Sequence, residues 1–148
     1  MKEQNPILQV KDLTVSFNAF AGKVQAVRGV NFDLNKGETL CIVGESGSGK
    51  SVTNKAIMGI LSKNAVIERG EILYDGMDLT KLTEKQFCQI RGKRIAMVFQ
   101  DPLSALNPIM KVGKQITETL RIHQNLSHEE ARKSAIELMG AVGIPEPE

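Results

Sequence analysis

Aromatic residues are scarce in this sequence of 148 residues. Trp is absent and Tyr occurs once, so the chain offers no evident aromatic platform for stacked nucleic-acid bases. The formal net charge is only +2, which is too small to favour nucleic acid or an anionic membrane surface as a ligand. We therefore expect no nucleic-acid partner.

Cysteine is scarce too, and long apolar runs are missing. Cys41 and Cys88 have a spacing that fits no metal motif, and two thiols do not make a disulfide framework. Cys41 lies in an apolar run, where we expect a small buried side chain, and free thiols are typical of a reducing, cytosolic compartment. The polar N-terminus lacks the apolar region of a signal peptide, and no run approaches the length of a membrane span. We therefore expect any membrane contact to come through a partner.

The apolar pattern that is present predicts strands of two kinds. Alternating apolar residues predict two strands over 7–17 and 24–34, with a bulge or bend near Lys11, and neighbours of this kind indicate an antiparallel sheet. Two short and almost continuously apolar runs, Thr39–Val43 and Ile95–Phe99, are typical of strands buried on both faces.

Turn and capping signals set the remaining elements. We expect a strand over 70–74 that enters a tight turn at Asp75-Gly76. Helical spacing and capping boxes predict four helices: Lys50 to about Leu61, Thr83 to about Arg91, Val112 to His123, and Ser127 to a stop at Gly143.

A phosphate-binding pattern, Gly-x4-Gly-Lys-Ser, runs from Gly44 to Ser51 between the first buried-type run and the first helix. Glycines permit positive φ and let backbone N–H groups approach phosphate oxygens, and a helix N-terminus adds free N–H groups. Lys50 supplies a charge that reaches the β- and γ-phosphates, and the Ser51 hydroxyl is placed to bind Mg²⁺. No Asn-Lys-x-Asp motif that reads guanine is present, so we predict ATP with Mg²⁺ as the ligand.

Three segments together resemble ATP-binding cassette proteins: GESGSGKS, GEILYDGMDL and IAMVFQDPLSALNP. Within these the chain looks most like the ATP-binding subunit of bacterial oligopeptide or dipeptide importers, from about Ile7 to the last residue. The resemblance implies an α/β fold of the P-loop NTPase type. The resemblance further implies that the chain divides into an antiparallel β subdomain (7–38), part of the P-loop core (39–100) and the start of a helical subdomain (101–148).

The resemblance also implies an activity and partners. It implies an ATPase bound peripherally at the cytoplasmic face of the bacterial cell membrane, which powers peptide import. Its partners would be transmembrane permease subunits and a second ATP-binding subunit, identical or different.

The resemblance assigns roles to single residues. It implies that Phe17 stacks on adenine, the alternative being a core strand residue. Val52 stands where many cassette proteins have Thr, so a hydroxyl contact to the α-phosphate is lost while the Val52 N–H remains a donor. The residues thus expected to contact the nucleotide are Phe17, Gly44, Glu45, Ser46, Gly47, Ser48, Gly49, Lys50, Ser51 and Val52.

Gln100 falls at the glutamine loop of the family, where its amide oxygen would reach Mg²⁺ or the attacking water. The expected catalytic residues are therefore Lys50 and Gln100, and the expected metal ligands are Ser51 and Gln100. One alternative is that Gln100 is a solvated loop residue. The other is that the run Ile95–Phe99 is a Walker B strand, after which Asp101 holds Mg²⁺. The resemblance further suggests Leu103, Leu106 and Met110 as contacts to the permease, and packing within the helical subdomain is the alternative.

Several motifs of the family are missing from the sequence: the Leu-Ser-Gly-Gly-Gln signature, a Walker B strand ending in Asp-Glu, and a switch histidine. The chain therefore resembles the first half of a cassette domain, of marginal stability alone, and we expect ATP hydrolysis by it to be very slow. Two alternatives stay open: a non-hydrolysing nucleotide-binding module that acts through association with a partner, and a small-molecule kinase.

Overall fold

The computed structural model describes residues 6–101 and 105–145. The chain divides into two compact units, with the division between Phe87 and Cys88. This division differs from the subdomain boundaries expected after residues 38 and 100, which stay predictions.

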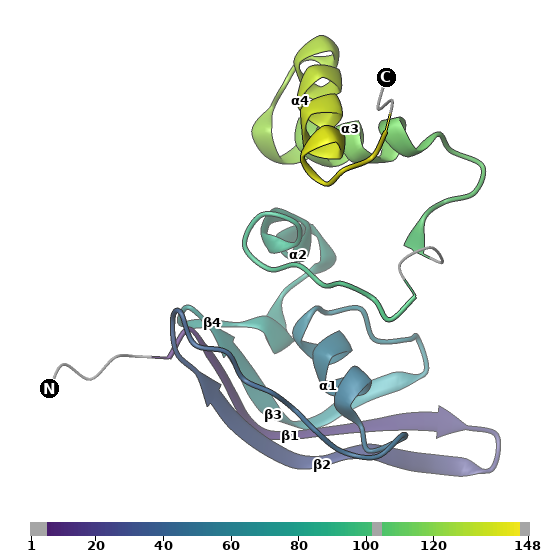
Figure 1. The fold of residues 1–148 in the computed structure, drawn as a ribbon. Helices are drawn as coiled ribbons and strands as arrows, with labels where there is room; N and C mark the ends of the chain where they lie inside the picture. Colours follow the sequence, from purple (N-terminus) through teal and green to yellow (C-terminus); the bar gives the residue numbers. More distant parts are fainter. Residues whose placement is uncertain (1–5, 102–104, 146–148) are drawn as a thin grey trace, which may run out of the picture. The chain divides into compact units, whose positions relative to one another are not determined.

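The first unit is built on an antiparallel sheet (Figure 1). The spatial order of its strands is β2-β1-β3-β4, so β1 lies between its two long neighbours. The strands are β1 (Leu8–Ala19), β2 (Gly22–Leu34), β3 (Ala65–Tyr74) and β4 (Met77–Asp78). The two expected N-terminal strands and their antiparallel pairing are therefore confirmed, as is the tight turn at Asp75-Gly76, where both residues have positive φ.

Bulges interrupt the register of β1. Lys11 pairs with Glu71 and Thr14 with Arg69, so β1 carries an extra residue there, and Asp12 has φ 47°. The bend expected near Lys11 is confirmed. Bulges strengthen the local twist of a sheet, and Figure 1 shows the long strands curving along their length.

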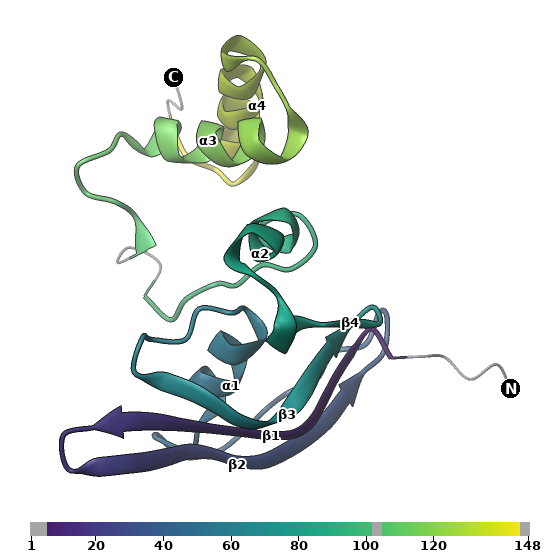
Figure 2. The ribbon, with the colours of Figure 1, turned by 180° about the vertical axis from the view of Figure 1, so that it is seen from behind.

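Helix α1 (Lys50–Ile57) lies against one face of this sheet in both ribbon views (Figures 1 and 2). It ends four residues earlier than expected because Gly59 takes φ 63° just past its end and donates its N–H to the Ala56 carbonyl. The buried apolar side chains of this unit are Val10, Leu13, Val15, Val27, Ala56, Ile72, Leu79 and Phe87.

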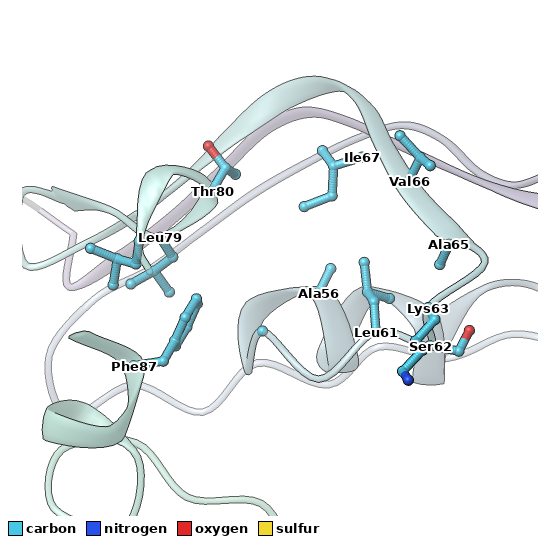
Figure 3. Close-up of a pocket in the computed structure, with 12 residues that line it drawn as sticks. Ala56, Leu61, Ser62, Lys63, Ala65, Val66, Ile67, Leu79, Thr80 and Phe87 are labelled. Atoms are coloured by element: carbon cyan, nitrogen blue, oxygen red, sulfur yellow. The ribbon is translucent and has the colours of Figure 1, made fainter. Parts of the chain in front are cut away.

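A short 3-10 helix, η1 (Leu79–Lys81), and the start of helix α2 (Glu84–Ile90) complete the first unit. The Thr83 N–H and hydroxyl both donate to Gln86 Oε1 at 2.8 Å, but the Gln86 N–H donates to the Thr83 carbonyl at 3.0 Å and not to the hydroxyl, so only one half of the expected capping box is present. Phe87, Leu79 and Ala56 surround a hollow of about 420 Å³ between α1 and β3 (Figure 3). The Phe87 ring also packs on Gly59, where a Cβ atom would lie 2.5 Å from it.

The run Thr39–Val43 is not a strand in the structure, which corrects the expectation of a strand buried on both faces. Val43 is 83% exposed, and Cys41 is exposed rather than buried. A strand of this type needs hydrogen-bonded neighbours, and among residues 6–101 and 105–145 no segment pairs with it.

The run Ile95–Phe99, in the second unit, is likewise not the buried strand expected. Only Ile95 forms a bridge, with Arg91 across a tight turn, and Val98 is 91% exposed. The apolar pattern indicates a place in a sheet, but the described residues supply no further strand beside this run.

Two helices dominate the second unit: α3 (Val112–Gln124) and α4 (His128–Ala141), close to the expected ranges. Ser127 caps α4 in a complete capping box with Glu130, and Gly143 ends it with φ 79°. Hydrogen bonds from the Ser127 hydroxyl and backbone N–H to the Glu130 carboxylate lower the pKa of Glu130. Across the described part of the chain, no helix has the length and apolarity needed to span a membrane.

Candidate functional site

The predicted phosphate loop is an exposed turn that leads into α1. Its backbone turns at Ser46-Gly47, and the Ser48 N–H donates to the Glu45 carbonyl at 3.2 Å. Gly47 has φ 83°, and a Cβ atom there would meet nothing within 4 Å. The loop is therefore open to solvent on the side where a ligand would approach.

Lys50 lies folded back across this loop. Its Nζ atom donates to the Gly44 and Glu45 carbonyl oxygens, both at 2.6 Å, and to the Ser48 hydroxyl at 3.3 Å. The loop thus holds the ammonium group of Lys50. The same ammonium group is predicted to help the loop bind phosphate. A phosphate group would compete with these two carbonyls for the same charge.

Gly49 fixes the loop to the sheet. It is buried, has φ 93°, and a Cβ atom there would lie 2.6 Å from the Ala26 carbonyl oxygen and 3.3 Å from Val27 Cγ2. Ala26 is the extra residue in a bulge of β2, because Val27 pairs with Val15 while Gln25 pairs with Ser16. Glycine is required here by both conformation and space. The contact with Ala26 was missed by sequence reasoning, because no local pattern marks which carbonyl a distant glycine will approach.

The N-terminus of α1 is free to bind an anion. Gly49 occupies its cap position without a side-chain hydrogen bond, and its first turn carries no acidic residue. The first N–H groups of a helix have no intrahelical partner, so those of Lys50, Ser51 and Val52 remain available. Thr53 points elsewhere: it is buried, and its hydroxyl donates to the Gly49 carbonyl at 3.1 Å.

Ser51 is exposed, and its hydroxyl has no hydrogen-bond partner among residues 6–101 and 105–145. A single neutral oxygen beside bound phosphates suits Mg²⁺, which keeps several waters and takes few protein ligands. Free N–H groups, an ammonium group and one hydroxyl therefore fit a magnesium-bound polyphosphate. Their assignment as the binding residues stays a prediction.

Phe17 lies on the sheet face that the phosphate loop contacts. Residues 13, 15 and 17 of β1 share one face, and Val15 pairs with Val27, which Gly49 approaches. Phe17 is half-buried, and its cross-strand neighbour Val24 is 58% exposed. An accessible ring on the same face as the loop is compatible with stacking on a base.

Gln100 belongs to the second unit, where it is exposed in a bend. Its predicted role toward Mg²⁺ rests on the resemblance alone. Asp101, the rival Walker B acid, follows no strand in this structure.

The residues expected to contact the permease lie in or near the loop before α3. Leu103 lies outside the described residues, Leu106 is 39% exposed and Met110 is half-buried. Gln115 of α3 holds this loop: its Oε1 accepts from the Asn107 N–H at 2.9 Å, and its Nε2 donates to the Asn107 and Met110 carbonyls at 3.0 Å. Sequence reasoning missed Gln115, since a polar residue in a helix carries no signal of such a loop contact.

The chain is similar to known proteins in both sequence and fold. Residues 27–147 match the family described as ABC transporter. The chain is 59% identical over 143 residues to the oligopeptide transport ATP-binding protein OppD of Bacillus subtilis, covering 96% of this chain and 40% of that protein. It is 52% identical over 146 residues to the dipeptide transport ATP-binding protein DppD of Lactococcus lactis, covering 98% of this chain and 42% of that protein.

Among solved structures, the ATP-binding cassette MJ0796, in a dimeric post-hydrolysis state bound to ADP and Pi, matches with a TM-score of 0.80. The two are 26% identical, and the match covers 94% of this chain and 58% of that one. The expected α/β fold of the P-loop type, present in part, is thereby confirmed. The chain spans about two fifths of the length of these curated relatives.

Proposed function

Because this chain belongs to the ABC transporter family, we propose that it is the nucleotide-binding part of a subunit that powers import of oligopeptides or dipeptides. The observation that carries this proposal is the phosphate loop, in which Lys50 and the free N-terminus of α1 converge on one exposed turn. The names of the relatives, oligopeptide and dipeptide transport ATP-binding proteins, support the substrate class.

The proposed ligand is ATP with Mg²⁺. Lys50 would exchange the Gly44 and Glu45 carbonyls for phosphate oxygens, while the N–H groups at the start of α1 donate to the same phosphates. Ser51 would hold Mg²⁺, which neutralises phosphate charge when bound, and Phe17 would stack on the adenine. Gln100 would be the second ligand of Mg²⁺, and its position would depend on whether the metal site is occupied.

The proposed partners are permease subunits in the membrane and a second ATP-binding subunit. With these partners, the protein would lie at the cytoplasmic face of the bacterial cell membrane. The dimeric state of the cassette MJ0796 supports the second partner. Leu106 and Met110, held in place through Gln115, are proposed contacts to the permease.

Hydrolysis requires groups that this sequence lacks, a Walker B carboxylate and a signature motif. We therefore expect the chain alone to bind ATP and to hydrolyse it very slowly. The same absence favours a second candidate function, a nucleotide-binding module that works through association with a partner and does not hydrolyse. Phosphate release from ATP without an added acceptor, by this chain and by a full-length relative, separates the two: if neither releases phosphate, the second candidate stands.

The proposal is tested by calorimetry of Mg-ATP binding to the wild type, Lys50→Ala and Lys55→Ala. Lys55 is an exposed base in the last turn of the same helix and serves as the matched control. We expect Lys50→Ala to weaken binding by about tenfold or more, which corresponds to about 1.4 kcal/mol. Lys55→Ala should leave affinity within about twofold of the wild type. Equal affinities in all three proteins would contradict the proposal.

A further inference from the structure

One side chain of α1 holds the backbone at the start of its own helix. The Thr53 hydroxyl donates to the Gly49 carbonyl at 3.1 Å, and the Thr53 N–H donates to the same oxygen at 2.9 Å. A carbonyl oxygen has two lone pairs, so a single residue uses both of them. Thr53 is only 4% exposed, and little water can therefore reach its hydroxyl to compete for this bond.

The sheet confines Gly49 at a second point. Gly49 is buried, and a Cβ atom on it would lie 2.6 Å from the Ala26 carbonyl oxygen in the bulge of β2. The bulge therefore limits movement of the Gly49 Cα atom toward β2, while Thr53 holds the Gly49 carbonyl. Contacts from two different elements thus fix the residue that caps α1.

This double contact sets the direction of one predicted phosphate donor. The Gly49 carbonyl and the Lys50 N–H belong to the same peptide group, which is planar and trans, so they point in opposite directions. The carbonyl points along α1 to Thr53, and the N–H consequently points out of the helix N-terminus, where a phosphate would bind. Whatever orients the Gly49 carbonyl also orients the Lys50 N–H.

The two donors of Lys50 differ in their readiness for a ligand. Its Nζ atom is bound to the Gly44 and Glu45 carbonyls, both at 2.6 Å, and has to leave them before it can contact a phosphate. The Lys50 N–H needs no such rearrangement, because the peptide group that carries it is already held. A donor that is oriented before the ligand arrives loses less entropy on binding.

We infer that Thr53 is a positioning residue for phosphate binding at this loop, although it contacts no ligand itself. The inference rests on the proposed function, because it requires the loop to bind Mg-ATP. Thr53 and Ala56 are the buried residues of α1, so packing is the competing explanation for a side chain of this shape. Valine would fill the same space without a hydroxyl, however, and the hydroxyl bonds the one carbonyl whose peptide group carries the Lys50 N–H.

Substitutions at Thr53 separate orientation from packing. Thr53→Val keeps the branched shape and removes the hydroxyl, whereas Thr53→Ser keeps the hydroxyl and removes a methyl group. The valine variant should fold, because the Gly49 carbonyl still accepts the backbone N–H of residue 53 and no buried polar group is left without a partner.

The measurement is calorimetry of the full chain with Mg-ATP and with inorganic triphosphate plus Mg²⁺. We expect Thr53→Val to bind both ligands about fivefold more weakly than the wild type, and Thr53→Ser to restore most of this affinity. The loss should be the same for both ligands because the affected donor faces the phosphates. If Thr53 served packing alone, the serine variant would bind more weakly than the valine variant.

Thr117→Val is the matched control. Thr117 is 8% exposed, and its hydroxyl donates to the Lys114 carbonyl at 3.1 Å within α3 of the second unit, so its loss should leave affinity for Mg-ATP unchanged. If hydrogen exchange of the β1 and β2 amides shows that Thr53→Val unfolds, Thr53→Ser and Thr53→Ala carry the test, because they too differ by the hydroxyl.

The outcomes distinguish this inference from the proposed function. Binding of Mg-ATP by the wild type, with equal affinity in Thr53→Val, would overturn the inference and leave the proposed function standing. Equal affinities in the serine and alanine variants would do the same. A wild-type chain that binds neither Mg-ATP nor triphosphate would overturn both.

Discussion

Gly49→Ala should destabilise the first unit more than Gly47→Ala. Both glycines have positive φ, 93° and 83°, so a methyl group brings similar backbone strain at each. The surroundings differ: a Cβ atom at Gly49 would lie 2.6 Å from the Ala26 carbonyl oxygen, whereas one at Gly47 would meet nothing within 4 Å. The pair of variants therefore separates conformation from contact.

The magnitudes follow from these two terms. Left-handed backbone costs about 1–2 kcal/mol for alanine, and its lower unfolded-state entropy returns about 0.4–1 kcal/mol. Overpacking against β2 adds about 1–3 kcal/mol for Gly49 alone. We expect the free energy of opening of the first unit to fall by about 2–4 kcal/mol in Gly49→Ala and by about 1 kcal/mol in Gly47→Ala.

Hydrogen exchange of the β1 and β2 amides measures this quantity for the first unit by itself. If the two variants lowered protection equally, the contact between the phosphate loop and the Ala26 bulge would carry no energy. The reasoning that the sheet fixes the loop through Gly49 would then be wrong.

Two other predictions concern the nucleotide base and the cap of α4. Phe17→Ala should weaken ATP binding by about tenfold, since stacking of a base on an aromatic ring is worth about 1–3 kcal/mol, while Phe20→Ala at the fully exposed hairpin tip should not. Calorimetry with ATP and with inorganic triphosphate checks this, and a loss of triphosphate affinity in Phe17→Ala would argue against stacking. The pKa of Glu130 is lowered in the folded protein, so its hydrogen bonds with Ser127 stabilise α4 fully at pH values above the ordinary pKa of 4.5. This stabilisation is lost as the pH falls through the lower pKa of the folded state. Amide exchange of α4 against pH should show this loss in the wild type but not in Ser127→Ala, and identical profiles would refute it.

Local signals in the sequence predicted local structure well. The bend near Lys11, the turn at Asp75-Gly76 and the box at Ser127 each depend on a few neighbouring residues, and all are confirmed. The phosphate loop was predicted from a pattern that is contiguous from Gly44 to Ser51, and its role stays a prediction.

Non-local structure was predicted less well. Apolar runs such as Thr39–Val43 indicate burial in a sheet, but whether a strand forms depends on partners elsewhere in the chain. The same holds for the site, because the Ala26 carbonyl and Gln115 act through contacts that no nearby residue announces. Residues that shape a site through tertiary contact are therefore the ones that pattern reading overlooks.

The exposed run Thr39–Val43 also bears on how the protein behaves in concentrated solution. It has no charge, proline or glycine, and its backbone pairs with no strand among the described residues. Segments of this kind add readily to strands of other molecules and seed ordered aggregates. We therefore expect these five residues, immediately before the predicted phosphate loop, to lower colloidal stability. Self-association through Thr39–Val43 should compete with nucleotide binding as the protein concentration rises. The reason is that the predicted phosphate loop follows this run directly, from Gly44.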